Sequence, residues 1–396
     1  MHVIPVHIRR EGFDPVAELA EIRESRPVTR LRLPTGAHVW LVTSYEHVRE
    51  VLSDADRFGS DGRTLADPAQ GGFSVAASGP LVRHGDLSVY DPPEHGRLRR
   101  MIAPAFSTRQ VRTLRPRIEE HIAELVDAMV AAGPTADLVE SFALPVPAMV
   151  ICELLGVPYE DRTAFNERTV ARFDSARDPV ARGDATRESL AYMAELVSRQ
   201  RTDPDHGILG TLVREHGTAI DDRELAGVGD LLLVTGHETT TNMLALGTLL
   251  LLRHPEQSAS VGAGENVDHI VEEMLRYLSV AQSSLPRVAR ADVVLGGKRI
   301  RRGERLLCSL PSANRDANWV SDGERFMPSR QAKGHLAFGH GIHYCIGAAL
   351  ARLEMGVAFP ALFRRLPTLR LAVPFEDVVF RPSALIHGVE RLPVTW

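Results

Sequence analysis

Hydrophobic residues along most of the chain recur at intervals of three or four positions, with polar residues between them. This spacing is typical of helices that bury one face. Alternation of polar and apolar residues, the strand pattern, is restricted to short pieces. The predicted helices are residues 14–26, 45–54, 94–105, 108–132, 142–155, 189–201, 221–253, 267–278 and 348–366, and the predicted strands are 29–33, 38–43, 293–295 and 304–309. Glycine and proline cluster at 66–79, 203–210 and 261–264, which indicates loops between helices.

The composition fits one compact protein. The chain has 396 residues, of which 44% are hydrophobic and 24% charged, so disordered and collagen-like classes are excluded. Because no low-complexity linker interrupts the helical segments, we predict a single domain over residues 1–396, mainly α with a small β part. Its β-rich part covers about 27–60 and 287–312, and its helical part covers about 90–280 and 345–366.

The net charge and the search for targeting signals limit the partners and the compartment that we expect for this protein. A net charge of −5 without a basic block argues against nucleic acid as the main partner. Residues 1–10 carry histidines and arginines where a secretory signal would be apolar. The most apolar run, 243–252, is about half of the roughly 20 residues that a membrane span needs. With so few and scattered cysteines a disulfide framework is excluded, and we expect a cytoplasmic protein without membrane contact.

The predicted helix 221–253 is unusually long. At the helical rise it would span roughly 50 Å, so it must cross the core. Its middle, 235–242, changes from apolar sequence to glycine, an acid and threonines. Polar groups in a buried helix are costly without partners, so we expect a cavity, waters or a ligand beside them.

Cys345 lies just before the last predicted helix, after a glycine-rich stretch. Free N–H groups and the positive helix end favour a thiolate there, which makes Cys345 a candidate nucleophile, zinc ligand or haem ligand. Zinc would need more ligands, yet Cys152 and Cys308 lie in apolar stretches without paired spacing. A nucleophile would need a base, and His343 is poorly placed two residues along an extended loop. On these residues alone, Cys345 could also be a buried cysteine with a structural role only.

The sequence from Phe338 to Gly347 is Phe-Gly-His-Gly-Ile-His-Tyr-Cys-Ile-Gly. It resembles the haem-binding loop of cytochrome P450 enzymes, Phe-Gly-x-Gly-x-His-x-Cys-x-Gly, with every fixed position filled. The resemblance implies that Cys345 is the axial ligand of the iron of haem b and that its thiolate favours cleavage of the O–O bond. It also implies that Phe338 packs near the sulfur, that Gly339 and Gly347 allow N–H contacts to it, and that His343 binds a haem propionate.

Glu273 and Arg276 lie three positions apart on one predicted helix, which by itself is more typical of a surface ion pair. They resemble the Glu-x-x-Arg motif of P450 enzymes, which supports the haem loop together with a later arginine. Here that arginine is Arg330.

His95 and Arg99 share one face of the predicted helix 94–105, and alone they are typical of a solvated basic face. They resemble the His-x-x-x-Arg of P450 enzymes, which binds the haem propionates. By the same resemblance, Arg287 supplies a third cation to the propionates.

Residues Gly236 to Thr240 read Gly-His-Glu-Thr-Thr and resemble the P450 motif of the central helix. The resemblance implies that Gly236 permits a local widening and that Glu238 and Thr239 are catalytic, passing protons to dioxygen at the haem. Threonine hydroxyls bonded to carbonyls one turn back are compatible with this role. Thr235 departs from the pattern, because bacterial members usually carry alanine there, and its effect on the pocket stays open.

These matches occur in the family's order, and the resemblance extends from about residue 27 to 396. The sequence is most similar in kind to the soluble bacterial P450s of actinomycete secondary metabolism. They imply a haem-thiolate monooxygenase that hydroxylates or epoxidises an organic substrate in natural-product biosynthesis, with electrons from NAD(P)H through a ferredoxin reductase and a ferredoxin. We expect the ferredoxin to dock on a cationic patch formed by Arg99, Arg100, Arg109 and Arg352.

The substrate stays open. By analogy the pocket would be lined by residues 62–84, 171–187, 232–239, 280–285 and 385–386. An apolar polyketide, macrolide or terpenoid suits part of these segments, whereas an aminoacyl group on an acyl or peptidyl carrier protein would suit their charged residues. Outside this reaction class, a non-catalytic haem carrier or sensor and a zinc or cysteine hydrolase are alternatives.

Overall fold

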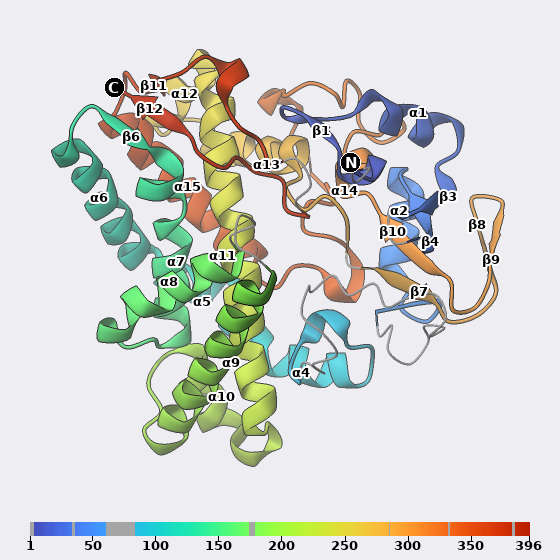
Figure 1. The fold of residues 1–396 in the computed structure, drawn as a ribbon, viewed down its shortest axis with the longest axis horizontal. Helices are drawn as coiled ribbons and strands as arrows, with labels where there is room; N and C mark the ends of the chain where they lie inside the picture. Colours follow the sequence, from blue (N-terminus) through green and yellow to red (C-terminus); the bar gives the residue numbers. More distant parts are fainter. Residues whose placement is uncertain are drawn as a thin grey trace.

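Helices make up most of the structure, and the main strands lie to one side of them (Figure 1). The computed structural model describes residues 4–33, 36–60, 84–173, 179–284, 286–331, 333–381 and 385–396. The helices are α1 (Ala17–Ser25), α2 (Tyr45–Ser53), α4 (Glu94–Ile102), α5 (Thr108–Thr113), α6 (Arg115–Ala132), α7 (Pro145–Leu155), α8 (Arg162–Phe173), α9 (Pro179–Thr202), α10 (Ile208–His216), α11 (Asp222–Leu252), α12 (Pro255–Gly262), α13 (Val267–Leu278), α14 (Leu310–Ala313) and α15 (Ala348–Arg365). The expected fold class, mainly α with a small β part, is confirmed.

The main sheet joins distant parts of the chain. Its strands follow the order β3 (Val28–Arg32), β4 (His38–Val42), β10 (Arg305–Cys308), β7 (Arg287–Ala289) and β5 (Phe58–Gly59). β4 and β10 are parallel, with Leu306 opposite Trp40, and the other neighbours are antiparallel. Smaller pairings join β1 (Arg10–Glu11) to β2 (Asp14–Pro15), β8 (Val293–Leu295) to β9 (Lys298–Ile300), and β12 (Pro393–Thr395) to both β6 (Thr135–Asp137) and β11 (Arg370–Leu371).

Proline explains most differences from the predicted helix boundaries. The predicted helix 108–132 is divided into α5 and α6, because Pro116 has no N–H to continue the preceding turn. α4 ends at Ile102, and a 3₁₀ turn with Pro104 follows it. α7 begins at Pro145 after a π-helical turn, and Pro15 belongs to β2, so α1 starts later than expected.

Some elements were not predicted. They are the helices α8, α10, α12 and α14, the first half of α9, and the strands β1, β2, β5, β6, β7, β9, β11 and β12. The missed strands have two or three residues each, which is too short for an alternating pattern. The expected loops at 203–210 and 261–264 are shortened by α10 and α12, and the expected loop at 66–79 lies outside the described residues.

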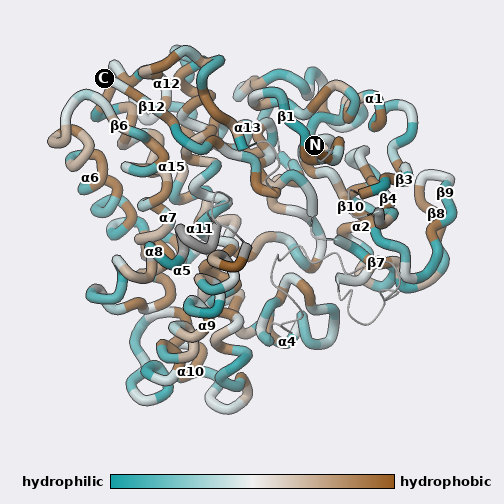
Figure 2. The backbone as a smooth tube through the Cα atoms, in the orientation of Figure 1, coloured by the Kyte–Doolittle hydropathy of each residue, from teal (hydrophilic) through white to brown (hydrophobic). Residues whose placement is uncertain are grey.

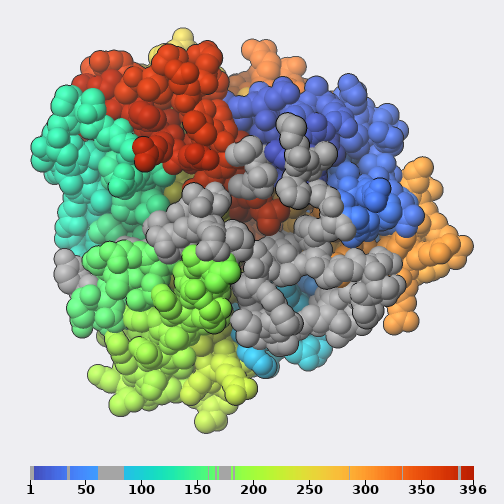
Figure 3. Space-filling model, viewed as in Figure 1, coloured from blue at the N-terminus to red at the C-terminus, as the bar shows by residue number. Residues whose placement is uncertain are grey.

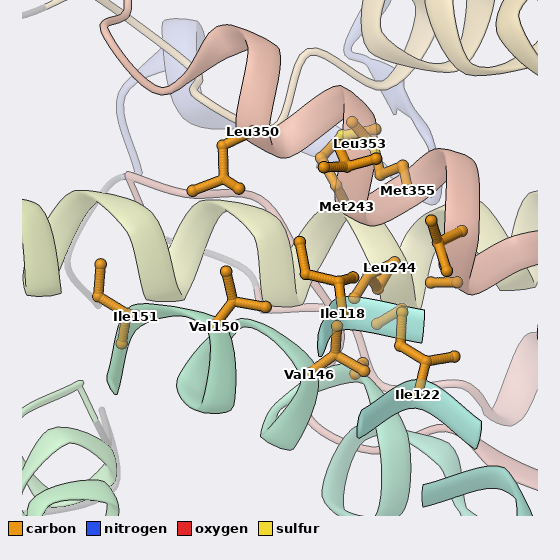
Figure 4. Close-up of a cluster of buried hydrophobic side chains, with 14 of the residues drawn as sticks. Ile118, Ile122, Val146, Val150, Ile151, Met243, Leu244, Leu350, Leu353 and Met355 are labelled. Atoms are coloured by element: carbon orange, nitrogen blue, oxygen red, sulfur yellow. The ribbon is translucent and has the colours of Figure 1, made fainter. Parts of the chain in front are cut away.

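α11 crosses the hydrophobic core, as its predicted length required. Met243 and Leu244 of α11 lie in one cluster with Ile118 of α6, Val146 of α7 and Leu353 of α15 (Figure 4). Burial of each such side chain stabilises the fold by roughly 1.5–3 kcal/mol. The outer helix α6 carries both hydrophobic and hydrophilic residues, as expected for one buried face (Figure 2).

The C-terminal segment packs against the helical part. β12 pairs with β6, and the red C-terminal residues lie beside the surface of α6 (Figure 3). Isolated bridges join Ala281 to Ile386 and Phe380 to Val389. These bridges hold the segment before β12 close to α11, where Arg381 lies near Glu238. None of the helices in the described part of the chain is long and apolar enough to pass through a membrane.

Candidate active site

Cys345 lies at the end of the segment 338–347, called the cysteine loop below, which leads into α15. Its backbone N–H donates to the Phe338 carbonyl oxygen at 2.9 Å. The N–H of Gly347 donates to the sulfur itself. The loop therefore holds the thiol at the N-terminal end of α15, where an N–H group supports negative charge.

Two glycines of the cysteine loop adopt backbone angles that other residues avoid. Gly339 has φ 72° and Gly341 has φ 73°. At Gly341 a methyl group would also overlap the carbonyl oxygen of Leu52 at the end of α2. Glycine at 341 is therefore required both by conformation and by space.

The environment of Cys345 contains opposing effects. Its side chain is exposed, yet the protein around it raises the pKa of the thiol by desolvation. The N–H of Gly347 and the charges of Arg99 and Arg352 act the other way and lower that pKa. Cys152 and Cys308 are buried, and desolvation raises the pKa of each to about 12, although Arg162 acts against this at Cys152 and Arg287 at Cys308. Only Cys345 combines an accessible sulfur with groups that favour a thiolate.

A cationic cluster lies next to the cysteine loop. It comprises His95 and Arg99 of α4, Arg287 at the start of β7, and His343 of the loop. The rings of His95 and His343 are 4.3 Å apart, and Nη2 of Arg99 donates to the Tyr344 carbonyl oxygen at 2.7 Å. The structure thus brings together two arginines and two histidines from three separate segments, as the resemblance implied.

This cluster favours an anion. Desolvation and the charges of Arg287, His95 and Arg99 lower the pKa of His343 to about 3. Desolvation and Arg99 also lower the pKa of His95, although Asp91 acts against this. Nε2 of His95 is buried and has no hydrogen-bond partner among the described residues. A negatively charged group placed here would be stabilised by the arginines and by both imidazoles.

A buried ion triad stands before the cysteine loop. Both carboxylate oxygens of Glu273 accept from Arg276, at 2.8 Å from Nε and 2.8 Å from Nη2. Nε of Arg330 donates to the same carboxylate at 3.0 Å, as does the Met327 N–H at 2.8 Å. Arg276 also donates to the Asn314 carbonyl oxygen at 2.9 Å. The triad joins α13 to the segment that precedes the loop.

On α11, the predicted catalytic residues share one stretch of helix. The Thr239 hydroxyl donates to the Thr235 carbonyl oxygen at 2.7 Å, one turn back, and the Thr235 hydroxyl does the same to Leu231. Gly236 lies within the continuous helix α11. Ile151 of α7 packs close to Gly236.

Glu238 has a partner that the sequence did not reveal. Oε1 of Glu238 lies 3.6 Å from Nη1 of Arg381, in the segment before β12. Burial raises the pKa of Glu238, and Arg381 partly offsets this. Arg381 is remote from Glu238 in sequence. The only sequence signal for its role at the site is that it lies a few residues before the predicted pocket residues 385–386. His237, next to Glu238, is buried and bonded to the Leu144 backbone, and burial lowers its pKa to about 4.

Of the expected substrate pocket, residues 62–83, 174–178 and 285 lie outside the described part of the chain. The described pocket residues include Leu232, which is buried, and Thr235, which is exposed. Ser60, whose hydroxyl lies 2.9 Å from Nε2 of His343, is a further site residue that no sequence pattern indicated.

A mainly helical fold with an exposed cysteine before a helix, beside arginines and histidines that suit an anion, is the arrangement that a haem-thiolate protein needs. The family profile described as Cytochrome P450 matches residues 265–373. The chain is 43% identical to Cytochrome P450-SU2 of Streptomyces griseolus, covering 97% of this chain and 94% of that protein, and 42% identical to pentalenic acid synthase of Streptomyces avermitilis, covering 97% and 95%. The structure of OxyB from teicoplanin biosynthesis in complex with the X-domain matches with a TM-score of 0.88 at 41% identity, covering 99% and 100%.

The chain belongs to the cytochrome P450 family and is a P450 monooxygenase. The expected similarity to actinomycete P450s of secondary metabolism is confirmed by these relatives. The family cofactor is haem b with a thiolate ligand, and the residues present fit it. Cys345 offers an accessible sulfur, and the cluster around the unpartnered Nε2 of His95 suits the carboxylates of haem.

Proposed function

We propose that Cys345 binds the haem iron and that His95, Arg99, Arg287 and His343 bind the propionates. The observation that carries this proposal is that an exposed cysteine lies beside Arg99, Arg287 and the buried, unpartnered Nε2 of His95. Phe338, Gly339 and Gly347 shape the cysteine loop, while Glu273, Arg276 and Arg330 support it. When bound, the haem uses two electrons to transfer one oxygen atom of O2 to the substrate and the other to water.

The test is the spectrum of the reduced, carbon monoxide-treated protein. A strongly red-shifted Soret band requires a thiolate ligand, so the wild type should show it and Cys345→Ala should not. Cys308→Ala is the matched control, because that thiol is buried in the main sheet region. The same band in Cys345→Ala, or its absence from the wild type, would contradict the proposal.

Glu238 and Thr239 move protons. Burial raises the pKa of the Glu238 carboxyl, which favours the protonated form that a proton donor needs, and Arg381 partly offsets this. The Thr239 hydroxyl donates to the Thr235 carbonyl, and its oxygen can still accept a hydrogen bond; to pass its proton on, the hydroxyl would turn away from that carbonyl as its oxygen receives a proton from the acid side. A haem carrier or sensor would not need this pair. Thr239→Ala should release peroxide in place of product, and unchanged coupling would contradict the relay.

The electrons come from NAD(P)H through a ferredoxin and its reductase in the cytoplasm. Arg100 and Arg109 are exposed on α4 and α5 and are the core of the docking patch. Arg99 donates to the Tyr344 carbonyl and Arg352 to Glu272, so the side chains of these two arginines contribute less to the docking patch. Arg100→Glu should slow reduction by ferredoxin in a salt-dependent way. A rate equal to that of the wild type would exclude the patch.

The substrate is an apolar polyketide, macrolide or terpenoid, which is hydroxylated or epoxidised. A second candidate, an aminoacyl group on a carrier protein, is favoured by the similarity to OxyB, whose structure is known in complex with the X-domain. Ligand-induced changes of the haem spin state separate the two. Titration with small apolar compounds and with aminoacyl groups, free and attached to a carrier protein, should give a response to the first set only. A response that requires the carrier would favour the second candidate.

A further inference from the structure

Glu272, the residue before the triad acid Glu273, makes a second ion cluster on α13. Nε and Nη2 of Arg352, on α15, donate to its two carboxylate oxygens, with a distance of 3.0 Å between Nη2 and Oε2. Nε2 of His335, just before the cysteine loop, lies 3.2 Å from the same Oε2. Glu273 thus joins α13 to the segment at 325–330, while Glu272 joins it to both ends of the cysteine loop.

The paired Arg352 lies directly on the cysteine loop. Its guanidinium carbon is 4.6 Å from the centre of the Phe338 ring. Its Nη1 lies 3.4 Å from the Tyr344 hydroxyl and 3.3 Å from the Ala348 carbonyl oxygen. The backbone of Phe338 in turn accepts the N–H of Cys345. The guanidinium therefore contacts two aromatic residues of the cysteine loop that precede Cys345 in sequence, and its charge favours the thiolate.

This pair differs from an ordinary surface ion pair. Two-point contact of a guanidinium with a carboxylate fixes its orientation, whereas a free arginine side chain extends into water. The side chains of Arg352 and Glu272 are 33% and 27% exposed. Arg365, also on α15, forms an ion pair at 3.2 Å with Asp127 of α6. The side chains of this pair are 54% and 67% exposed, so the pair is a matched control for Arg352 and Glu272.

We propose that Glu272 and Arg352 are a positioning pair for the cysteine ligand: Glu272 holds the Arg352 guanidinium against Phe338, so that a fixed positive charge stabilises the electron-rich thiolate. This inference rests on the proposed ligation of haem by Cys345. Because reduction of the iron adds negative charge at the site, loss of the fixed cation makes reduction less favourable.

The test is a double-mutant cycle in the midpoint potential of the haem-loaded protein. Arg352→Met should shift the potential negative, equivalent to a roughly threefold to tenfold smaller equilibrium constant for reduction. In the Glu272→Ala background, Arg352 is no longer held, so Arg352→Met should cause little further shift. Arg352→Lys, which keeps the charge, should recover part of the potential, and Arg365→Met should leave it unchanged.

Urea denaturation of the same variants separates positioning from mere support. A loss of stability in Arg352→Met without a shift in potential would overturn the proposal, and so would equal shifts in both backgrounds. If the wild type lacked the red-shifted Soret band with carbon monoxide, ligation by Cys345 would be wrong and this inference would fall with it. If the wild type shows the band but the effects of the Glu272 and Arg352 substitutions on the potential are additive, the positioning pair is refuted and ligation by Cys345 is not.

Discussion

Replacing Glu273 by glutamine tests whether the buried triad stabilises the fold around the cysteine loop. The side chains of Arg276 and Glu273 are 0% and 1% exposed, and that of Arg330 is 7% exposed. Glutamine keeps the shape of the side chain but removes its charge. It also places an NH2 group, a donor, where a carboxylate oxygen now accepts from a guanidinium.

The magnitude follows from what is left unpaired. The carboxylate accepts two N–H groups of Arg276, one of Arg330 and the backbone N–H of Met327. Breaking a buried pair by removing one partner costs about 3–5 kcal/mol, because a charge stays buried without compensation. Against a typical stability of about 5–15 kcal/mol, this is a large fraction of the total. We expect Glu273→Gln to lower the free energy of unfolding by that amount and to lower the yield of haem-loaded protein.

The assay is urea denaturation followed by far-UV circular dichroism. Glu119→Gln is the control, because Glu119 and Arg115 form a pair on α6 whose side chains are each 51% exposed. An exposed pair of this kind contributes less than about 1 kcal/mol. Equal losses in the two variants would refute the conclusion that the triad is a buried, mutually dependent unit.

Three further predictions follow from individual sites. Gly341→Ala should reduce haem-loaded protein with the red-shifted carbon monoxide band, because φ is 73° and a neighbouring carbonyl oxygen occupies the space, whereas Gly356→Ala, in open space on α15, should not. Burial raises the pKa of Glu354 to about 8, so the unfolded chain loses this proton first and stability should fall as pH rises from about 4.5 to 8. Glu354→Gln should remove this fall, worth about 3 kcal/mol at pH 7, in denaturation series at several pH values, and an unchanged pH profile would contradict it. Arg381→Met removes the cation beside Glu238, so the pKa of that acid should rise further, and the pH profile of product formation should move to higher pH; an unmoved profile would exclude the interaction.

Local patterns in the sequence carried much of the prediction. The sequence pattern identified α11, α13 and α15 to within two residues of their ends, since long helical segments are the elements that a sequence pattern marks best. The cysteine loop was predicted from its resemblance to the P450 motif, and two of its glycines, Gly339 and Gly341, do adopt backbone angles that other residues avoid. Short strands such as β7, which carries Arg287, were missed because two or three residues contain no period.

The sequence by itself determined which residue types could carry chemistry: a cysteine at a helix start, an acid and alcohol in the central helix, and spaced cations. Tertiary structure decided how they are paired. Glu238 meets Arg381, and Glu272 meets Arg352, across distances along the chain that no local pattern spans. The physical reason is that burial and Coulomb interactions depend on separation in space, so the pKa of a carboxyl and the orientation of a guanidinium are fixed only when distant elements pack.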